Sequence, residues 1–147
     1  MNYVEEKRDI FDYLESKEHY FVQCISADFA MGAGIAKAFN EHFDAKNRMF
    51  KKYDKNVWNG HGRCAELLPD VPVFNLITKR YFWHTPSYKT ITEALEHLRE
   101  LAEEHGIKKL VMPKIGCGLD RLDWDKVSKI IKYTFGNRDF DITICYI

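Results

Sequence analysis

The sequence predicts an α/β fold in which helices cover both faces of a mixed, mostly parallel sheet. Two units with the order strand, glycine loop and helix carry this prediction, one at residues 20–42 and one at residues 109–135. Two further apolar stretches flank a Pro69-Asp70 turn and predict an antiparallel hairpin. We therefore expect a three-layer α/β/α sandwich.

Length and composition indicate one domain over residues 1–147. The chain is 46% hydrophobic and 30% charged, which is typical of a globular protein with one core. The 22 basic and 22 acidic residues balance, so the overall positive charge of a dedicated duplex-DNA-binding protein is missing. With this charge balance we expect a monomer.

We expect neither a signal peptide nor a membrane span in this sequence. Residues 1–16 carry charges throughout, and no stretch reaches the roughly 20 apolar residues that cross a bilayer. We expect a cytoplasmic protein, or a nuclear one in a eukaryote, with no membrane partner. The histidines and the four cysteines lack metal-ligand spacing, so no metal site is predicted.

The first half of the chain begins with a short strand at residues 3–4 and a helical turn at residues 10–14. The nearly continuous apolar run at residues 20–25 predicts a strand buried on both faces, in the centre of the sheet. A helix follows, with Ile35, Ala38 and Phe39 on one face, and ends near His42. The basic segment 46–55 predicts a short solvated helix.

The hairpin and the clearest helix come next. Strands are expected at residues 62–68 and 71–78. An apolar stripe predicts a helix over residues 90–105, with Thr90 and Glu93 as its capping box and Gly106 at its end.

The last third repeats the order strand, loop and helix. Residues 109–112 form a short apolar strand, and an amphipathic helix over residues 124–135 stops at Gly136. Alternating apolar residues at 140–146 predict a half-buried final strand.

Gly32-Ala33-Gly34 lies between a predicted strand and the helix that follows it. Backbone N–H groups and the positive end of a helix can face a phosphate there without obstruction by side chains. A dinucleotide fingerprint would need glycine where Lys37 stands, and no Lys-Ser/Thr follows for a Walker loop. A tight connection without a ligand is the alternative interpretation.

Gly116-Cys117-Gly118 repeats this arrangement before the last helix. If the two preceding strands are neighbours, both loops flank one crevice at the carboxyl ends of the strands, where α/β sheets bind ligands. The pair of loops therefore predicts that a diphosphate is held from both sides.

Lys79 and Arg80 follow the third apolar strand, and Asp120 and Arg121 follow the second glycine loop. A surface ion pair is one interpretation. A catalytic role needs a lysine desolvated enough to act as a nucleophile.

Five further side chains have two interpretations each. Ser26 and Asp28 line or cap the first loop, and Trp83, His84 and Tyr88 form a substrate wall or a packed aromatic corner.

Four stretches resemble the macrodomain family, in particular its terminal ADP-ribose protein glycohydrolase and O-acetyl-ADP-ribose deacetylase branch. They are Gln23–Asp28, Met31–Ala36, Leu76–Lys79 and Pro113–Leu122. The resemblance implies a macrodomain sandwich that binds ADP-ribose and releases it from glutamate or aspartate esters on proteins. It also implies deacylation of O-acetyl-ADP-ribose and no metal or redox cofactor.

The same resemblance implies roles for individual residues. Lys79 matches the nucleophile that attacks the anomeric carbon of the distal ribose, and Asp120 matches the carboxylate that assists and resolves the adduct. Asp9 is expected at adenine, although Arg8 stands before it where the family usually has glycine, and the segment 81–84 is bulkier than expected. The implied ligand-binding residues are Asp9, Ile10, Ser26, Met31, Gly32, Ala33, Gly34, Ile35, Thr78, Pro113, Ile115, Gly116, Cys117, Gly118 and Leu119.

Three alternatives share this pocket. They are a non-catalytic ADP-ribose reader, a phosphatase acting on ADP-ribose 1''-phosphate, and a hydrolase of ADP-ribosylated nucleic acid. In the last, the basic segment 46–55 would contact the nucleic acid backbone.

Overall fold

The chain folds around a mixed sheet, which separates two layers of helices. The computed structural model describes residues 1–53 and 64–147, and within them the sheet has six strands in the order β1-β6-β5-β2-β4-β3. All neighbouring strands are parallel except β3 and β4. The strands are β1 (Asn2–Lys7), β2 (His19–Ser26), β3 (Ala65–Leu67), β4 (Val73–Lys79), β5 (Lys109–Met112) and β6 (Asp141–Tyr146).

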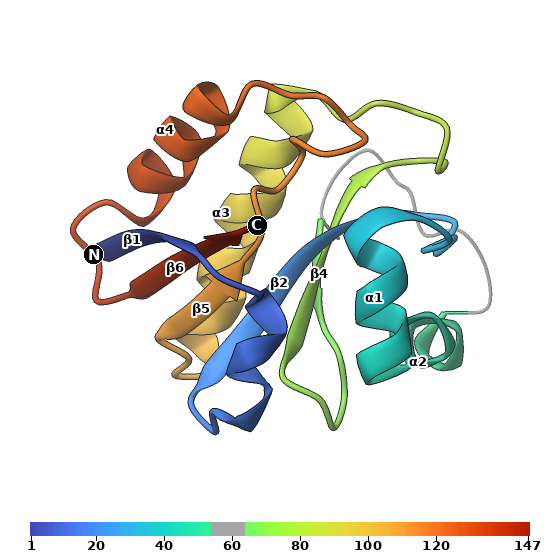
Figure 1. Cartoon of the computed structure of the whole chain (residues 1–147), viewed down its shortest axis with the longest axis horizontal. Coiled ribbons are helices and arrows are strands. Elements are labelled where there is room, and N and C mark those ends of the chain that lie inside the picture. The colour runs from blue at the N-terminus through green and yellow to red at the C-terminus, as the bar shows by residue number, and fades with distance from the viewer. Residues whose placement is uncertain (54–63) are drawn as a thin grey trace.

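Helices cover both faces of this sheet, as the sequence predicted (Figure 1). One face packs against α3 and α4, and the other against α1, α2 and the 3-10 helix η1. The bounds are η1 (Ile10–Glu15), α1 (Gly34–Phe43), α2 (Ala45–Lys52), α3 (Tyr88–Glu104) and α4 (Trp124–Phe135). The three-layer α/β/α sandwich is therefore confirmed.

Each face of the sheet has its own hydrophobic core, because side chains alternate along the strands. In the central strand β2, Val22 belongs to the core under α3 and α4, whereas Phe21 and Ile25 belong to the core under α1 and α2. These three residues are at most 4% exposed. The prediction of a central strand buried on both faces is therefore confirmed.

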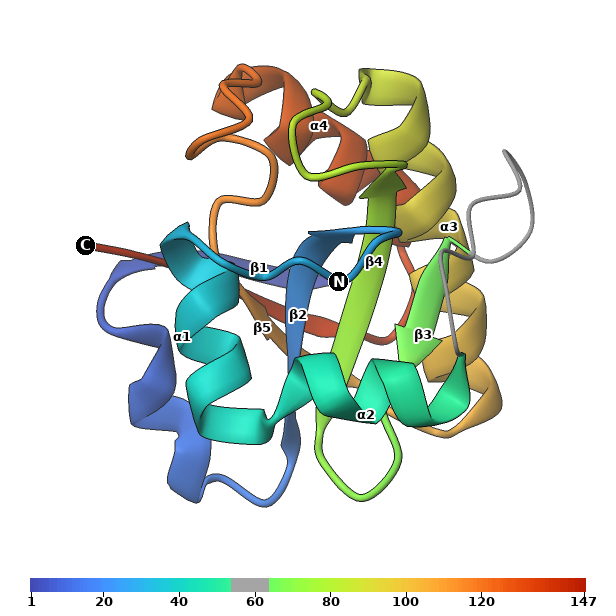
Figure 2. The same cartoon turned by 90° about the vertical axis from the view of Figure 1, so that its right-hand side faces the viewer.

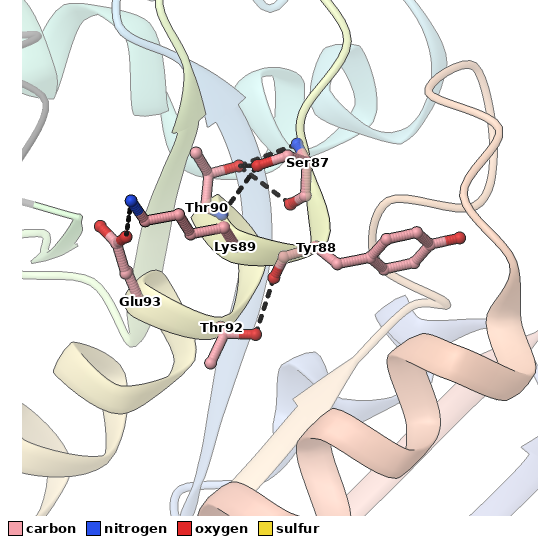
Figure 3. A network of polar contacts seen from close by, with 6 residues as sticks. All are labelled: Ser87, Tyr88, Lys89, Thr90, Thr92 and Glu93. Atoms are coloured by element: carbon pink, nitrogen blue, oxygen red, sulfur yellow. Dashed lines mark hydrogen bonds and ion pairs between the residues drawn. The ribbon is translucent and has the colours of Figure 1, made fainter.

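The start of α3 differs from the prediction. The N-cap is Ser87, whose hydroxyl accepts from the Thr90 backbone N–H at 3.1 Å, while the Thr90 hydroxyl accepts from the Ser87 N–H at 3.0 Å (Figure 3). The predicted capping box of Thr90 and Glu93 was wrong by three residues. Glu93 lies instead near Lys89, at 3.9 Å, one turn earlier on the helix. The Thr-x-x-Glu pattern was misleading because Ser87 offers an equally good cap earlier in the chain.

The edge strand β3 and helix α2 are joined by a buried carboxylate. Glu66 of β3 accepts from Lys52 Nζ at 2.7 Å and from the Tyr53 hydroxyl. The predicted strand at 62–68 and helix at 46–55 are both present in shorter form. Residues 54–55 and 62–63 of these predictions lie outside the described residues. Within the described ranges, no helix is long and apolar enough to cross a membrane.

The parallel strands place their carboxyl ends along one edge of the sheet. The segments that follow β1, β5, β2 and β4 therefore meet there, and Figure 2 shows α1 starting at this edge. Helix α2 lies at the opposite end of the sheet in the same view. There, Arg48 of α2 donates to the carbonyl of Pro69 in the turn before β4, at 3.1 Å.

Candidate active site

A lysine and an aspartate from two different loops meet at this edge. Lys79 ends β4, Asp120 lies between β5 and α4, and Lys79 Nζ is 2.6 Å from Asp120 Oδ1. Their side chains are only 14% and 18% exposed, against 63% and 84% for the surface pair Lys108–Asp139. The Lys79–Asp120 pair is therefore shielded from solvent, unlike the surface ion pair that was the alternative interpretation.

A register shift in the sheet sets the position of Lys79. Ile25 of β2 pairs with Ile77 of β4, but the next residue, Ser26, pairs with Lys79, so Thr78 has no partner in the register. Such bulges bend a strand and redirect its side chains. The Lys79 carbonyl accepts from the Ala27 N–H at 2.8 Å, which fixes the end of β4 against the start of the first loop.

The first loop, between β2 and α1, is held by the carboxylate of Asp28. Its Oδ1 accepts from the Ser26 hydroxyl and from the Ala30 N–H, the latter at 3.2 Å, and its Oδ2 accepts from the Phe82 N–H at 3.0 Å. Asp28 therefore connects the first loop to the segment that follows Lys79.

The backbone of this loop is unusual. Phe29 and Met31 have φ values of 59° and 44°, in the left-handed region that non-glycine residues rarely adopt. Strained backbone of this kind clusters at binding and catalytic sites, where the surrounding structure holds it in place. Phe29 is fully buried and Met31 is 6% exposed, so packing beneath the loop supplies that support.

Helix α1 begins in this loop without a side-chain cap. Its N-cap is Ala33, which has an extended backbone and no side-chain capping bond. The N–H groups of the first helical turn have no partners within a helix, so they are free to face an anion. A Cβ built on Gly32 would come no closer than 3.9 Å to a neighbouring atom, which indicates an open approach to the backbone.

The second loop, between β5 and α4, makes a tight turn. Gly116 has a φ of 73°, and its carbonyl accepts from the Leu122 N–H at 2.8 Å. Tyr88 at the start of α3 points away from its helix (Figure 3), and its hydroxyl accepts from the Asp123 N–H at 3.0 Å. Tyr88 therefore supports the second loop, a role that neither the substrate wall nor the aromatic corner included.

The two glycine loops lie side by side. A Cβ built on Gly34, whose φ is 59°, would lie 3.4 Å from Cδ1 of Leu119. Leu119 itself is 74% exposed, and a Cβ on Gly118 would meet nothing within 4 Å. The backbone of both loops is thus accessible beside the Lys79–Asp120 pair.

The other implied ligand-binding residues differ in their exposure to solvent. Ile35 is 41% exposed at the start of α1, whereas Ile10, Ser26, Thr78 and Ile115 are buried and can reach a ligand mainly through their backbone. Pro113 and Cys117 are partly buried in the second loop.

Asp9 is exposed after β1, where its Oδ1 caps η1 by accepting from the Phe11 N–H at 2.9 Å. The Arg8 side chain is turned towards Asp12, with Nε 3.2 Å from Oδ2. Arg8 thus pairs beside η1, one residue before the position expected at adenine.

The cysteines near the site are not thiolates at neutral pH. Burial, together with the nearby charge of Asp120, raises the pKa of Cys24 to about 12, and burial raises the pKa of Cys117 to about 11. Since the thiolate is the nucleophilic form, neither side chain competes with Lys79 as a nucleophile. Among the described residues, no three His, Cys, Asp or Glu side chains gather as metal ligands.

A cavity of about 460 Å³ adjoins Lys79 and is lined by Thr78, Lys79, Arg80, His84, Thr85, Ser87 and Thr90. The sequence reasoning considered His84 but missed Thr85, Ser87 and Thr90 as lining residues. Their only signal was a run of hydroxyl side chains shortly after Lys79. A larger cavity of about 1110 Å³ lies beside the edge strand β3, away from the lysine and the loops.

Comparisons with known proteins agree with this geometry. A family model described as "Macro domain" matches residues 22–131. ADP-ribose glycohydrolase OARD1 of Bos taurus is 39% identical over 124 residues, which cover 84% of this chain and 78% of the bovine protein.

Solved structures agree in fold. The macrodomain of Thermus aquaticus DarG superposes with a TM-score of 0.79 at 19% identity, covering 99% of this chain and 98% of that chain. The structure of Thermosipho africanus DarTG in complex with ADP-ribose superposes with a TM-score of 0.76 at 22% identity, covering 99% of this chain and 41% of that chain. At these identities the two structures establish the fold alone.

Proposed function

The chain belongs to the macro domain family, as its sequence motifs predicted, and on this premise we propose that it is an ADP-ribose hydrolase. Its substrates are ADP-ribose esters of glutamate and aspartate side chains on proteins, and O-acetyl-ADP-ribose. The observation that carries the proposal is the shielded Lys79–Asp120 pair, 2.6 Å apart, beside two accessible glycine loops. The name of the bovine relative, ADP-ribose glycohydrolase, supports it.

The order of the strands supports one direction for the bound ligand. Along the edge, the segment after β1 carries Asp9, those after β5 and β2 are the glycine loops, and β4 ends with Lys79. Adenine at Asp9, the diphosphate between the loops and the distal ribose at Lys79 follow this order. Four strand spacings of about 4.8 Å give roughly 19 Å from β1 to β4, enough for an extended dinucleotide-like ligand.

Binding of the diphosphate rests on backbone rather than on charged side chains. The uncapped first turn of α1 supplies N–H donors and the positive end of a helix. Gly32 and Gly118 leave the approach open, because neither bears a Cβ that would block it. Affinity for ADP-ribose is therefore largely separate from the Lys79 side chain.

For the glutamate and aspartate esters, whose carboxyl oxygen is bonded to the anomeric carbon, the proposed reaction proceeds through an adduct on Lys79. Asp120 accepts a proton from the ammonium group, and the freed amine attacks the anomeric carbon of the distal ribose. A C–N bond forms as the C–O bond to the carrier breaks, and the carrier carboxylate leaves with the electron pair. Water then attacks the same carbon, displaces the amine and completes ADP-ribose, with Asp120 directing the proton transfers.

The competing functions fit the site less well. A reader of ADP-ribose needs the loops but gains nothing from a shielded lysine–aspartate pair, and a phosphatase needs no lysine adduct. For a nucleic acid substrate, the basic helix α2 lies at the opposite end of the sheet (Figure 2). There, Arg48 and Lys52 already bind Pro69 and Glu66.

The test is release of ADP-ribose from a protein modified on glutamate, followed by mass spectrometry. Wild type, Lys79→Ala and Asp120→Ala are compared with Lys109→Ala as the matched control. Lys109 also forms an ion pair, with Glu18 at 2.8 Å, but at the other end of the strands. We expect release by wild type and Lys109→Ala, and a loss of at least about a hundredfold in the other two, as for general acid–base and nucleophilic groups. Binding without release by all four proteins would make the chain a reader.

A further inference from the structure

We propose that the aromatic segment Tyr81–His84 is the carrier-side subsite of the enzyme, and that Asp28 is the positioning residue that aligns it with Lys79. The subsite receives the polypeptide that carries the ADP-ribosyl ester. This inference rests on the proposed function and adds to it the residues that select the carrier.

The segment exposes large aromatic side chains directly after Lys79. Phe82 and Trp83 are 61% and 64% exposed. The segment is ordered. The ring centroids of Tyr81 and Trp83 lie 4.7 Å apart, with an interplanar angle of 1°. The His84 N–H donates to the Tyr81 carbonyl at 3.0 Å. An ordered aromatic surface that solvent can reach is typical of a recognition site.

The position of the segment assigns it to the carrier rather than to ADP-ribose. The aromatic segment leads from β4 to α3, and its Phe82 N–H contacts the first glycine loop by donating to Asp28 Oδ2 at 3.0 Å. The cavity of about 460 Å³ joins Lys79 to His84 and continues to Thr85, Ser87 and Thr90. With the distal ribose at Lys79, we place the carrier in this cavity, where His84 brings the aromatic segment beside it.

Asp28 connects the two sides of the site. One carboxylate oxygen holds Ser26 and Ala30 in the phosphate-binding loop, and the other accepts from the Phe82 N–H at 3.0 Å in the aromatic segment. A carboxylate that bridges two loops in this way fixes their separation. Asp28 therefore acts on the carrier through the aromatic segment and does not touch the reacting atoms.

The composition of the subsite favours a polypeptide over a nucleic acid. Beyond Lys79, whose charge is paired with Asp120, the described residues lining the cavity include one cation, Arg80, and otherwise His84 and hydroxyl side chains. Binding to nucleic acid is dominated by several cations that contact phosphates. Aromatic rings beside hydroxyl groups instead match the side chains and backbone of an extended peptide.

The experiment compares two substrates that share ADP-ribose but differ in the carrier. We would measure kcat/KM for O-acetyl-ADP-ribose and for a protein modified on glutamate, and take the protein-to-acetyl ratio. Trp83→Ala, Asp28→Ala and the double variant are tested against Tyr133→Ala, which removes an aromatic ring 90% exposed on α4. An ADP-ribosylated oligonucleotide serves as a third substrate.

We expect the ratio to fall about tenfold in Trp83→Ala, the effect of losing one good aromatic contact. It should also fall in Asp28→Ala, no further in the double variant, and stay at the wild-type value in Tyr133→Ala. An unchanged ratio in Trp83→Ala overturns the subsite, and equal losses on both substrates in Asp28→Ala overturn its positioning role. A loss confined to the oligonucleotide overturns the polypeptide carrier. If wild type hydrolyses neither ester, the proposed function itself fails.

Discussion

Replacing Gly116 by alanine should destabilise the protein by about 2 kcal/mol. The φ of Gly116 is 73°, where a residue with a Cβ loses roughly 1–2 kcal/mol. The new methyl group would also lie 3.0 Å from Cδ1 of Leu122 and 3.5 Å from Cδ1 of Ile91, so Leu122 must move by a few tenths of an ångström. For a chain of this length, a loss of about 2 kcal/mol lowers Tm by roughly 4 to 8 °C.

Gly118→Ala is the matched control, two residues further along the same loop. Its φ lies outside the left-handed region and its Cβ would meet nothing within 4 Å, so the free energy of unfolding should change by less than about 0.5 kcal/mol. Because the methyl group would narrow the approach to the diphosphate, the Kd for ADP-ribose should rise about tenfold, equivalent to about 1.4 kcal/mol. Urea unfolding and calorimetric titration measure the two effects. We assign the shape of the loop to Gly116 and access for the ligand to Gly118. Equal destabilisation by both substitutions, or no destabilisation by Gly116→Ala, would refute this assignment.

Further predictions concern the cap of α3, a thiol and a buried carboxylate. Ser87→Ala should cost about 1 kcal/mol in urea unfolding and Glu93→Ala less than about 0.5 kcal/mol, and the reverse order would contradict the observed cap. Since the folded pKa of Cys117 is about 11 against 9.0 for the free thiol, its stabilising effect is complete below pH 9 and is lost as the pH rises towards 11. Its alkylation should therefore be slow at pH 8, and fast labelling of the folded protein there would contradict the raised pKa. Glu66→Gln should lower the free energy of unfolding by about 1–3 kcal/mol, because it replaces a buried charged acceptor for Lys52, whereas no change in urea unfolding would mean that this link between α2 and β3 is dispensable.

Hydrophobic patterning was sufficient to predict most of the fold. The apolar run of β2 and the amphipathic stripes of α3 and α4 each report burial directly, and the structure places them as predicted. The start of α3 was less predictable, because Ser87 and Thr90 are both good caps and only packing decides between them.

The parts of the candidate site that depend on local backbone shape could be predicted from the sequence. The two glycine loops, Lys79 at the end of β4 and Asp120 after the second loop followed from the sequence and the family motifs. The bulge at Thr78 and the bridging role of Asp28 did not, because both depend on pairing between segments about 50 residues apart. The hydrogen bond by which Tyr88 supports the second loop also joins distant segments, so the sequence did not predict it.

In the proposed site the loops bind ADP-ribose and Lys79 supplies the chemistry, so a single variant separates the two properties. ADP-ribose affinity and release of ADP-ribose from a glutamate-modified protein are measured for Lys79→Ala beside wild type. We expect a Kd for ADP-ribose within about threefold of wild type, a change below about 1 kcal/mol, together with loss of release. Release that continues without the Lys79 amine would exclude Lys79 as the nucleophile.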